Sequence, residues 1–253
     1  MPANETGAAL VTGAGKRIGR ALALTLADAG YHVAVHYNAS SKDADDVVAL
    51  IKAKGRKAVA LRADLSQEAE VSTLIKQAGD ALGPLNLLVN SASAFAHDDV
   101  ASMTRESWDL HMEVNLRAPA KLSQDFAAQA KPGAQIVNII DQRVLKLTPQ
   151  FLSYTASKAA LWVLTRTMAQ GLGPSGIRVN AIGPGPTLKN PRQSDEDWRR
   201  QNEATILGHG ADPKDICGAL VYLLSARSVT GQMIAVDGGQ HLAWKTPDVL
   251  VQE

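Results

Sequence analysis

The sequence predicts a single α/β domain of the doubly wound type, in which a seven-stranded parallel sheet carries helices on both faces. Short apolar runs rich in Val, Ile and Leu alternate with longer helical patterns along the 253 residues, as expected for repeated strand–helix–strand units. The apolar runs lack strict polar alternation, which is typical of strands that helices bury on both faces. No linker, low-complexity segment or internal repeat divides the chain, so we expect one domain over residues 1–253.

The expected strands and helices follow one another in regular order. The strands are predicted at residues 8–12, 31–37, 57–63, 85–90, 135–140, 177–182 and 233–238. The helices between them are predicted at residues 17–29, 42–54, 67–81, 104–130, 153–172 and 213–225. Because a crossover helix returns the chain to the same end of the sheet after each strand, neighbouring strands should pair in parallel.

Residues 183–211 interrupt this rhythm. They contain several Pro and Gly residues and many charges, with a short helix expected near 195–206. The segment follows the sixth strand at its carboxyl end, where ligands bind in open α/β sheets. Long loops in compact domains are usually functional or disordered, so we interpret residues 183–211 as a substrate lid in preference to a surface insertion.

The composition argues against several classes of function. The formal net charge is +1, from 26 basic and 25 acidic residues, which gives no excess of positive charge for nucleic acid or an anionic membrane. The single cysteine, Cys217, fits a reducing compartment. No secretory pattern is visible, and no apolar run approaches the ~18 residues of a membrane-spanning helix. We therefore expect a cytoplasmic protein, and no histidine spacing predicts a metal site.

The stretch "LVTGAGKRIG", residues 10–19, runs from a strand through a glycine-containing turn into a helix. Gly13, Gly15 and Gly19 would let the backbone approach a pyrophosphate, and the helix N-terminus offers unpaired N–H groups and a positive dipole end. A plain loop is the alternative. In this strand–turn–helix setting, at the first βα unit, the pattern predicts a dinucleotide site.

The end of the second strand indicates which dinucleotide is bound. An NAD site usually places Asp or Glu there to bind the ribose 2′-hydroxyl, but no acid occurs between His36 and Asp43. Lys16 and Arg17 lie in the first turn instead. Hydrogen-bond donors and a cation suit a 2′-phosphate, so the sequence favours NADPH over NADH, unless these two cations are merely solvated.

Later strand ends complete the predicted nucleotide site. Asp64 could accept a hydrogen bond from the adenine amino group, and Asn90 could lie along the cofactor. The predicted cofactor contacts are Gly13, Gly15, Lys16, Arg17, Ile18, Gly19, His36, Tyr37, Asn38, Ser40, Ser41, Asp64, Leu65, Asn90, Ser91, Ala92, Lys158, Pro184, Gly185 and Thr187.

Tyr154 and Lys158 form the clearest candidate for catalysis. Their i, i+4 spacing places both on one face of a helix. A nearby ammonium stabilises a phenolate, so it makes a tyrosine with a reference pKa of ~10 a competent proton donor. Lys158 could also hold the nicotinamide ribose. A tyrosine and a lysine without function on a helix surface are the alternative.

Several motifs together resemble the short-chain dehydrogenases/reductases. They are "TGAGKRIG", "NSAS", Asn115 in "EVNLRAP", "YTASK", "RVNAIGPGPT" and "VDGG", and the resemblance covers about residues 8–243. It implies a Rossmann-type fold, an NAD(P)(H) cofactor and a dimer or tetramer, of which we expect a homotetramer with two-fold axes. It also implies a catalytic set of Asn115, Asp141, Tyr154 and Lys158.

Two departures from the usual family pattern narrow the resemblance. Arg17 stands where the glycine motif usually has a small residue, and Asp141 stands where a catalytic serine is usual. With "HYNAS" at the second strand end and Phe95 after "NSAS", the chain is similar to pteridine reductases and bacterial dihydromonapterin reductases. These enzymes reduce dihydropterins or oxidised pterins with NADPH. Ala39 replaces a basic residue of better-known members, so 2′-phosphate binding would depend on Arg17, Asn38, Ser40 and Ser41.

A carboxylate at position 141 suits a pterin better than a ketone. An ionised aspartate would repel the oxygen of a carbonyl that gains negative charge, whereas a pterin receives hydride at a C=N carbon and a proton at the ring nitrogen. Asp141 could hold the Tyr154 hydroxyl or orient a water, and burial would raise its pKa towards an acid role. The alternative is that Asp141 caps a loop in a protein without reductase activity.

The resemblance also implies the substrate pocket. Phe95 would stack a pterin against the nicotinamide, Ser93 would meet its polar edge, and lid residues would cover it. The predicted substrate contacts are Arg17, Ser93, Phe95, Asp141, Tyr154, Leu188 and Trp198.

Three functional hypotheses follow from the sequence. The first is an NADPH-dependent reductase of the C=N bond of a small pterin substrate. The second is another short-chain carbonyl or imine reductase. The third is a non-catalytic NADPH-binding regulator, because a fold does not fix a function.

Overall fold

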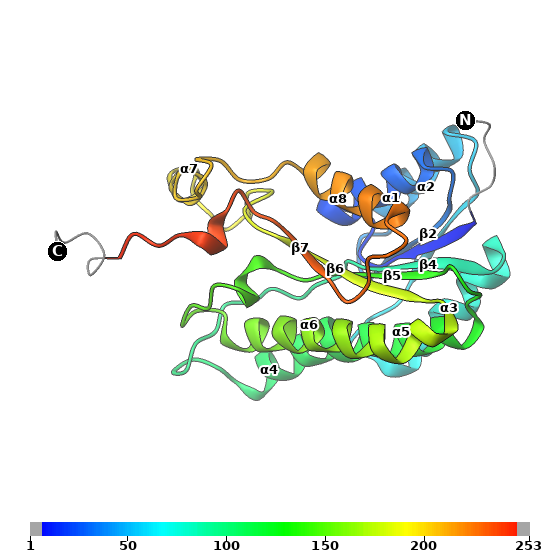
Figure 1. The fold of residues 1–253 in the computed structure, drawn as a ribbon, viewed down its shortest axis with the longest axis horizontal. Helices are drawn as coiled ribbons and strands as arrows, with labels where there is room; N and C mark the ends of the chain where they lie inside the picture. Colours follow the sequence, from blue (N-terminus) through cyan, green and yellow to red (C-terminus); the bar gives the residue numbers. More distant parts are fainter. Residues whose placement is uncertain (1–6, 247–253) are drawn as a thin grey trace.

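The computed structural model describes residues 7–246 and contains a seven-stranded sheet between two layers of helices (Figure 1). The strands are β1 (Ala8–Val11), β2 (His32–Tyr37), β3 (Ala58–Arg62), β4 (Leu85–Asn90), β5 (Gln135–Ile139), β6 (Arg178–Pro184) and β7 (Met233–Val236). Their order is β3-β2-β1-β4-β5-β6-β7, and every neighbouring pair is parallel. The predicted fold class is confirmed. Residues 1–6 and 247–253 of the predicted domain lie outside the described residues.

The helices cover both faces of this sheet. One layer holds α1 (Arg17–Asp28), α2 (Ser41–Ala53) and α8 (Pro213–Ser225), which lie above the sheet in Figure 1. The other holds α3 (Glu68–Leu82), α5 (Ala118–Gln129) and α6 (Leu152–Leu172), with α4 (Arg105–Met112) packed against α6. The strand order reverses between β1 and β4, where a crevice opens at the carboxyl ends of the strands in such folds.

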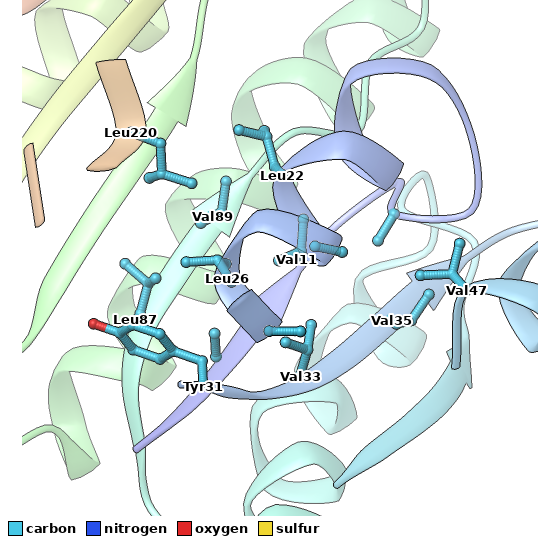
Figure 2. Close-up of a cluster of buried hydrophobic side chains, with 14 of the residues drawn as sticks. Val11, Leu22, Leu26, Tyr31, Val33, Val35, Val47, Leu87, Val89 and Leu220 are labelled. Carbon is cyan, nitrogen blue, oxygen red and sulfur yellow. The ribbon is translucent and has the colours of Figure 1, made fainter. Parts of the chain in front are cut away.

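Alternation along the strands produces two separate cores. In β1, Ala9 and Val11 belong to the cluster under α1, α2 and α8, whereas Ala8 and Leu10 belong to the cluster over α3 and α5. Figure 2 shows the first cluster, in which Leu22 and Leu26 of α1 pack onto the strands. All four residues of β1 are buried, because successive side chains point to opposite, covered faces.

The prediction of one continuous helix over residues 104–130 is wrong in its middle. The chain forms α4, then a π-helical segment (Glu113–Arg117), then α5. Asn115 lies in the π-helical segment and is buried. Such segments insert one residue into a helix and often occur at functional sites, and the apolar pattern of the sequence does not reveal that insertion.

The segment predicted as a lid also begins later in the chain than expected. Residues 183 and 184 belong to β6, which extends two residues beyond the predicted strand because they pair with Ala235 and Val236 of β7. After β6 the chain leaves the sheet and carries the predicted short helix, α7 (Asp195–Glu203), which stands apart from both layers at the left of Figure 1.

The turn between β1 and α1 depends on close packing at Gly19. A Cβ atom there would overlap the carbonyl group of Gly13, so we expect Gly19→Ala to lower the free energy of unfolding by about 1–3 kcal/mol through overpacking. Thermal unfolding followed by circular dichroism measures this change. The matched control is Gly218→Ala in the interior of α8, where, apart from the adjacent helix backbone, no heavy atom of the described residues lies within 4 Å of the added Cβ. Alanine is the better helix former by about 0.5–1 kcal/mol, so the control should raise the midpoint; equal midpoints for the two variants would contradict the packing argument.

Candidate active site

The ends of β1 and β4 are joined by the hydroxyl of Thr12. This buried oxygen accepts hydrogen bonds from the N–H groups of Ser91 and Ala92, at 2.9 and 3.0 Å. The following residue, Gly13, has a φ of +65°, and a Cβ there would lie 2.8 Å from the Cα of Ala92. Only glycine fits this turn, which brings two of the predicted cofactor-binding segments together at the strand-order reversal. Sequence reasoning did not single out Thr12, although its place directly before the glycine turn was a usable signal.

His36 shapes the same turn from β2. Its Nδ1 accepts from the N–H of Gly13 at 3.0 Å, so its Nε2 carries the proton and donates to the carbonyl of Ala63 at 3.0 Å. Burial lowers the pKa of His36 to about 4, against a smaller opposite effect of the Ala63 hydrogen bond. The ring is therefore neutral, and both of its nitrogens are hydrogen-bonded within the protein.

An open cavity of about 340 Å³ lies beside the glycine turn. Its lining residues are Gly15, Lys16, Arg17, Arg20, Asp43 and Asp46. Lys16 and Asp43 form an ion pair at 3.0 Å, which is weak because both side chains are exposed. Asn38 and Ser41 are exposed nearby in the chain. Arg20 and Asp46 were not predicted, although their i+3 spacing from Arg17 and Asp43 places them on the same helix faces.

The remaining predicted cofactor residues lie along the same edge of the sheet. Asn90 donates from Nδ2 to Asn138 at 2.8 Å, while its buried Oδ1 has no hydrogen-bond partner among residues 7–246. Asp64 accepts from the N–H and hydroxyl of Ser66 at 2.9 and 2.8 Å, and these bonds lower its pKa. The side chain of Leu65, in contrast, is part of the hydrophobic core.

Further along this edge, β6 delivers the last predicted cofactor segment. Pro184 ends the strand, and the hydroxyl of Thr187 donates to the carbonyl of Gly185 at 3.0 Å. A Cβ at Gly185 would lie 2.6 Å from the Cα of Asp237, so this stretch passes close to the chain that follows β7.

Asp141, Tyr154 and Lys158 meet at the carboxyl ends of β5 and β6. The Tyr154 hydroxyl donates to Oδ2 of Asp141 at 2.8 Å, and Lys158 Nζ donates to the carbonyl of Ile139 at 2.9 Å. The other carboxylate oxygen of Asp141 accepts from the N–H of Arg143 at 2.7 Å. Lys158 Nζ lies 5.8 Å from the centre of the Tyr154 ring. The predicted set is thus assembled, with the carboxylate directly on the tyrosine.

Burial perturbs all three groups. It raises the pKa of Asp141, although hydrogen bonds from Arg143 and Tyr154 act in the opposite direction. It raises the pKa of Tyr154 well above its ordinary value, and the charge of Asp141 adds to this effect. It lowers the pKa of Lys158 to about 8, which the charge of Asp141 partly offsets. Opposed shifts in one buried cluster are typical of active sites.

Comparison with known proteins identifies the family. The family model described as "Enoyl-(Acyl carrier protein) reductase" matches residues 13–241 of the chain. A "Short-chain type dehydrogenase/reductase" from Picea abies is 31% identical over 252 residues, which cover 92% of this chain and 91% of the relative. The chain belongs to the short-chain dehydrogenase/reductase family.

Two members of the family are more similar to this chain. The 3-oxoacyl-(acyl-carrier-protein) reductase FabG from Staphylococcus epidermidis is 34% identical over 241 residues, covering 92% of this chain and 98% of the relative. The crystal structure of FolM alternative dihydrofolate reductase 1 from Brucella canis, complexed with NADP, is 46% identical with a TM-score of 0.92. That match covers 97% of this chain and 98% of the Brucella chain.

Within this short-chain dehydrogenase/reductase, Asn115 holds the loop that follows β4. Its Oδ1 accepts from the N–H of Ala94 at 2.8 Å and from the hydroxyl of Ser93 at 3.2 Å, and its Nδ2 donates to the carbonyl of Ala94 at 3.0 Å. Nδ2 also lies 3.2 Å from the hydroxyl oxygen of Ser157 on α6. The π-helical segment therefore links α6 to Ser93, which the sequence predicted as a substrate contact.

Phe95 forms an aromatic wall beside Tyr154. Its ring stacks on Phe151 at 4.5 Å between centres, with planes 7° apart, and meets Tyr154 edge-on at 4.7 Å. The Phe95 side chain is 37% exposed, which is unusual for a core aromatic residue. Phe151 was missed by sequence reasoning, although it lies three residues before Tyr154 and could have been noticed there. The Arg143 guanidinium lies 5.0 Å from the centre of the Phe151 ring.

Two arginines link the segment after β6, which the sequence predicted as a lid, to this site. Arg17 donates from Nη1 to the carbonyl of Lys189 at 3.0 Å and from Nη2 to the carbonyl of Leu188 at 2.8 Å. Arg192 of the lid donates to the carbonyl of Phe95 at 2.8 Å, a contact that sequence reasoning missed. Leu188 is thus fixed near the glycine turn, whereas the half-buried Trp198 lies on α7.

The described residues contain neither a metal site nor a membrane span. Within residues 7–246, no group of three or more His, Cys, Asp or Glu side chains could hold a metal ion. Over the same range, no helix has the length and apolar character that crossing a membrane requires.

The cluster predicts a coupled titration. Because the Asp141 charge raises the pKa of Lys158, we expect Asp141→Asn to lower it below its value of about 8. NMR titration of the labelled lysine ammonium groups measures this shift. The control is Asp195→Asn, which removes an exposed carboxylate that pairs with Lys189 and should leave Lys158 unchanged. A Lys158 that titrates near its ordinary pKa of ~10 in the wild type would contradict the burial effect.

Proposed function

We propose that this protein is an NADPH-dependent reductase that transfers hydride to a C=N bond of a pterin. The observation that carries the proposal is the Asp141 carboxylate, bound at 2.8 Å to the Tyr154 hydroxyl, at the place where the family resemblance predicts a serine. The Brucella canis relative, which is 46% identical, is named an alternative dihydrofolate reductase. Dihydrofolate contains a dihydropterin ring, so that name supports the same chemistry here.

The nucleotide end of the site fits NADPH. Gly13 and Gly19 allow a tight turn in which an added Cβ would overlap neighbouring backbone, and α1 begins directly after this turn, so that its N-terminal N–H groups can bind a phosphate. The buried Oδ1 of Asn90 has no partner in the described part of the chain and offers an acceptor along the predicted path of the cofactor. Arg17 and Arg20 border the open cavity at the place expected for a 2′-phosphate. When bound, NADPH supplies the hydride.

Tyr154 then supplies the proton, and Asp141 holds its hydroxyl. Hydride addition to the ring carbon leaves an electron pair and negative charge on the adjacent nitrogen, which takes the Tyr154 proton. Burial and the Asp141 charge raise the pKa of Tyr154 well above its ordinary value, so the hydroxyl carries its proton at neutral pH, and the hydrogen bond to Asp141 at 2.8 Å holds that hydroxyl in place. The Lys158 ammonium stabilises the phenolate that forms, and that charge is fully present only below its pKa of about 8. The reaction consumes one NADPH and one proton for each C=N bond reduced.

The pocket walls suit a flat, polar heterocycle. Phe95 offers a partly exposed ring beside Tyr154, and stacking contributes about 0.5–1.5 kcal/mol beyond the burial of area. Ser93 lies two residues before Phe95 in sequence and is fixed by Asn115, so its hydroxyl can meet the polar edge of the ring. Arg17 keeps N–H donors beyond the two that the lid carbonyls use. In this proposal, Leu188 and Trp198 cover the side of the substrate that faces the lid.

A second candidate is reduction of a 3-oxoacyl group, which the FabG relative favours at 34% identity. An ionised Asp141 beside Tyr154 opposes it, because a ketone oxygen that gains negative charge would face a carboxylate. A non-catalytic NADPH-binding role would leave the buried Asp141–Tyr154 pair without a purpose.

The family resemblance also supports a cytoplasmic homotetramer. Trp108 and Leu110 on α4 and Val163 on α6 are large apolar side chains exposed on the outer helical layer. Exposed apolar surface of this kind marks subunit contacts.

The substrate assay separates these candidates. We expect NADPH oxidation with dihydrobiopterin, dihydromonapterin or dihydrofolate, and none with a simple diketone, because Asp141 disfavours a developing oxyanion. The same panel with NADH is the control for the cofactor and should be slower. Turnover of the diketone alone would overturn the pterin proposal in favour of a carbonyl reductase. Tight NADPH binding without any turnover would favour a regulator.

Two variants test the roles of the pocket residues. Tyr154→Phe should reduce kcat by about 10²–10⁴-fold, because it removes the proton donor. Phe95→Ala should mainly raise KM for the pterin, because it removes the stacking surface. Steady-state kinetics measures both, with Tyr222→Phe on the exposed face of α8 as the matched tyrosine control. Near-wild-type kcat in Tyr154→Phe would refute the mechanism.

A further inference from the structure

The helix that carries Tyr154 lacks a cap of its own. The residue before α6, Phe151, has φ +58° and ψ +49° and makes no side-chain capping hydrogen bond. This left-handed conformation is unfavourable for a bulky residue. The first N–H groups of any α-helix have no intrahelical partner, so acceptors must come from elsewhere. Tyr154 lies in the first turn of α6, so its position depends on those acceptors.

Asp98 supplies those acceptors from the loop after β4. Its carbonyl accepts from the N–H groups of Phe151 and Leu152 at 2.7 and 3.2 Å. Its Oδ1 accepts from the N–H of Ser153 at 3.1 Å, and its Oδ2 accepts from the Ser153 hydroxyl. A residue 55 positions earlier in the chain than Ser153 therefore satisfies three consecutive N–H groups at the start of α6. Its carboxylate also meets the positive end of the helix dipole.

His111 extends this connection in a fixed direction. The N–H of Ala96 donates to Nε2 of His111 at 3.0 Å, so the ring proton is on Nδ1. Nδ1–H then donates to the hydroxyl oxygen of Ser153 at 2.6 Å, and the Ser153 proton goes to Asp98. Because the serine proton is directed to the carboxylate and not to the histidine, this Ser–His–Asp group does not activate a nucleophile.

Burial and hydrogen bonding keep Asp98 and His111 in one protonation state. Asp98, His111 and Ser153 are at most 1% exposed. Burial raises the pKa of Asp98, but hydrogen bonds from Ser153 and Ser107 outweigh it and leave the pKa below its usual value. Burial lowers the pKa of His111, with a smaller opposite effect from Asp98. The carboxylate is therefore ionised and the ring neutral, as the hydrogen-bond directions require.

The network joins the two sides of the substrate pocket. Asp98 and Ala96 belong to the loop that carries Phe95, whereas Ser153 precedes Tyr154 on α6. The rings of Phe95 and Phe151 stack across the same junction. Displacement of this loop relative to α6 would change the position of the Phe95 ring with respect to the Tyr154 hydroxyl.

We propose that Asp98 is a positioning residue for the reaction. Through Ser153 and His111 it sets the distance between the stacking surface of Phe95 and the proton donor of Tyr154, and it touches neither substrate nor cofactor. This inference rests on the proposed function of the site, since pterin reduction is its first readout.

The test is Asp98→Asn. The side-chain carbonyl oxygen of this variant can still accept from the Ser153 N–H, but its amide group would face the Ser153 hydroxyl proton. The Ser153 proton could not turn towards His111 either, because the Nδ1–H group there is also a donor. The variant therefore leaves this hydroxyl proton without an acceptor in the network. We expect kcat to fall about 10- to 100-fold, the scale of a misplacement near 1 Å. KM for the pterin should rise, while the dissociation constant for NADPH should stay within about twofold.

Asp99→Asn is the matched control. Asp99 is the adjacent carboxylate and also accepts several hydrogen bonds, but from Ala101 and Ser102 in its own turn. Its kcat and KM should match those of the wild type. Ser153→Ala is the second variant: it removes the hydroxyl yet keeps the backbone bond to Asp98, and it should show the same change in kcat and KM. Rates are divided by the number of NADPH-binding sites, which removes loss from misfolding.

Wild-type kcat and KM per NADPH site in Asp98→Asn and Ser153→Ala would overturn the positioning role. If the wild type reduces no pterin, the proposed function fails, and the same comparison is made with whichever carbonyl substrate it does reduce. Amide hydrogen exchange of residues 151–153 is a readout independent of any substrate. Faster exchange in Asp98→Asn but not in Asp99→Asn supports the cap, and unchanged exchange overturns it.

Discussion

Burial of both faces of the sheet is the constraint on which the rest of the structure depends. β1 and the strands beside it lie between two helical layers, so polar chemistry is confined to the edge where the strands end. Thr12 and His36 hold the glycine turn at this edge through backbone N–H groups. Asp141 and Lys158 reach the same edge, and their burial produces the opposed pKa shifts. One arrangement thus generates both the nucleotide end and the catalytic end of the site.

The local features of this molecule were predictable from sequence, and the distant contacts were not. Strand burial follows from apolar runs, the glycine turn from its strand–turn–helix setting, and the Tyr154–Lys158 pair from helical spacing. The one-residue insertion around Asn115 left the apolar pattern unchanged and was missed. The cap of α6 by Asp98 joins residues 55 apart, and the contacts of Arg17 with the lid join residues 172 and 171 apart. The spacing of apolar residues along the sequence predicts no such pairs, because these contacts form only when the chain has folded.

The two similar relatives have names that imply different substrates, although both match this chain over almost its full length. FabG, at 34% identity, and FolM, at 46%, each match almost the full length of the chain, so the overall fold does not separate their chemistries. For this chain, the carboxylate beside Tyr154 is the feature by which our proposal distinguishes the two reactions. A carboxylate there favours a substrate that gains a proton on nitrogen and disfavours one that develops charge on oxygen. In our proposal, the choice between the two reactions in this chain therefore depends on one residue directly after β5, Asp141.

The way in which Arg17 holds the lid has a consequence for the evolution of the protein. Its guanidinium binds the main-chain carbonyls of Leu188 and Lys189, and Arg192 binds the main-chain carbonyl of Phe95. Every residue has a carbonyl, so these attachments do not depend on which side chains occupy positions 188, 189 and 95. Those side chains can be exchanged for others while the lid remains fastened. The attachment of this segment is thereby independent of the side chains at those three positions, which can change while the main chain stays held.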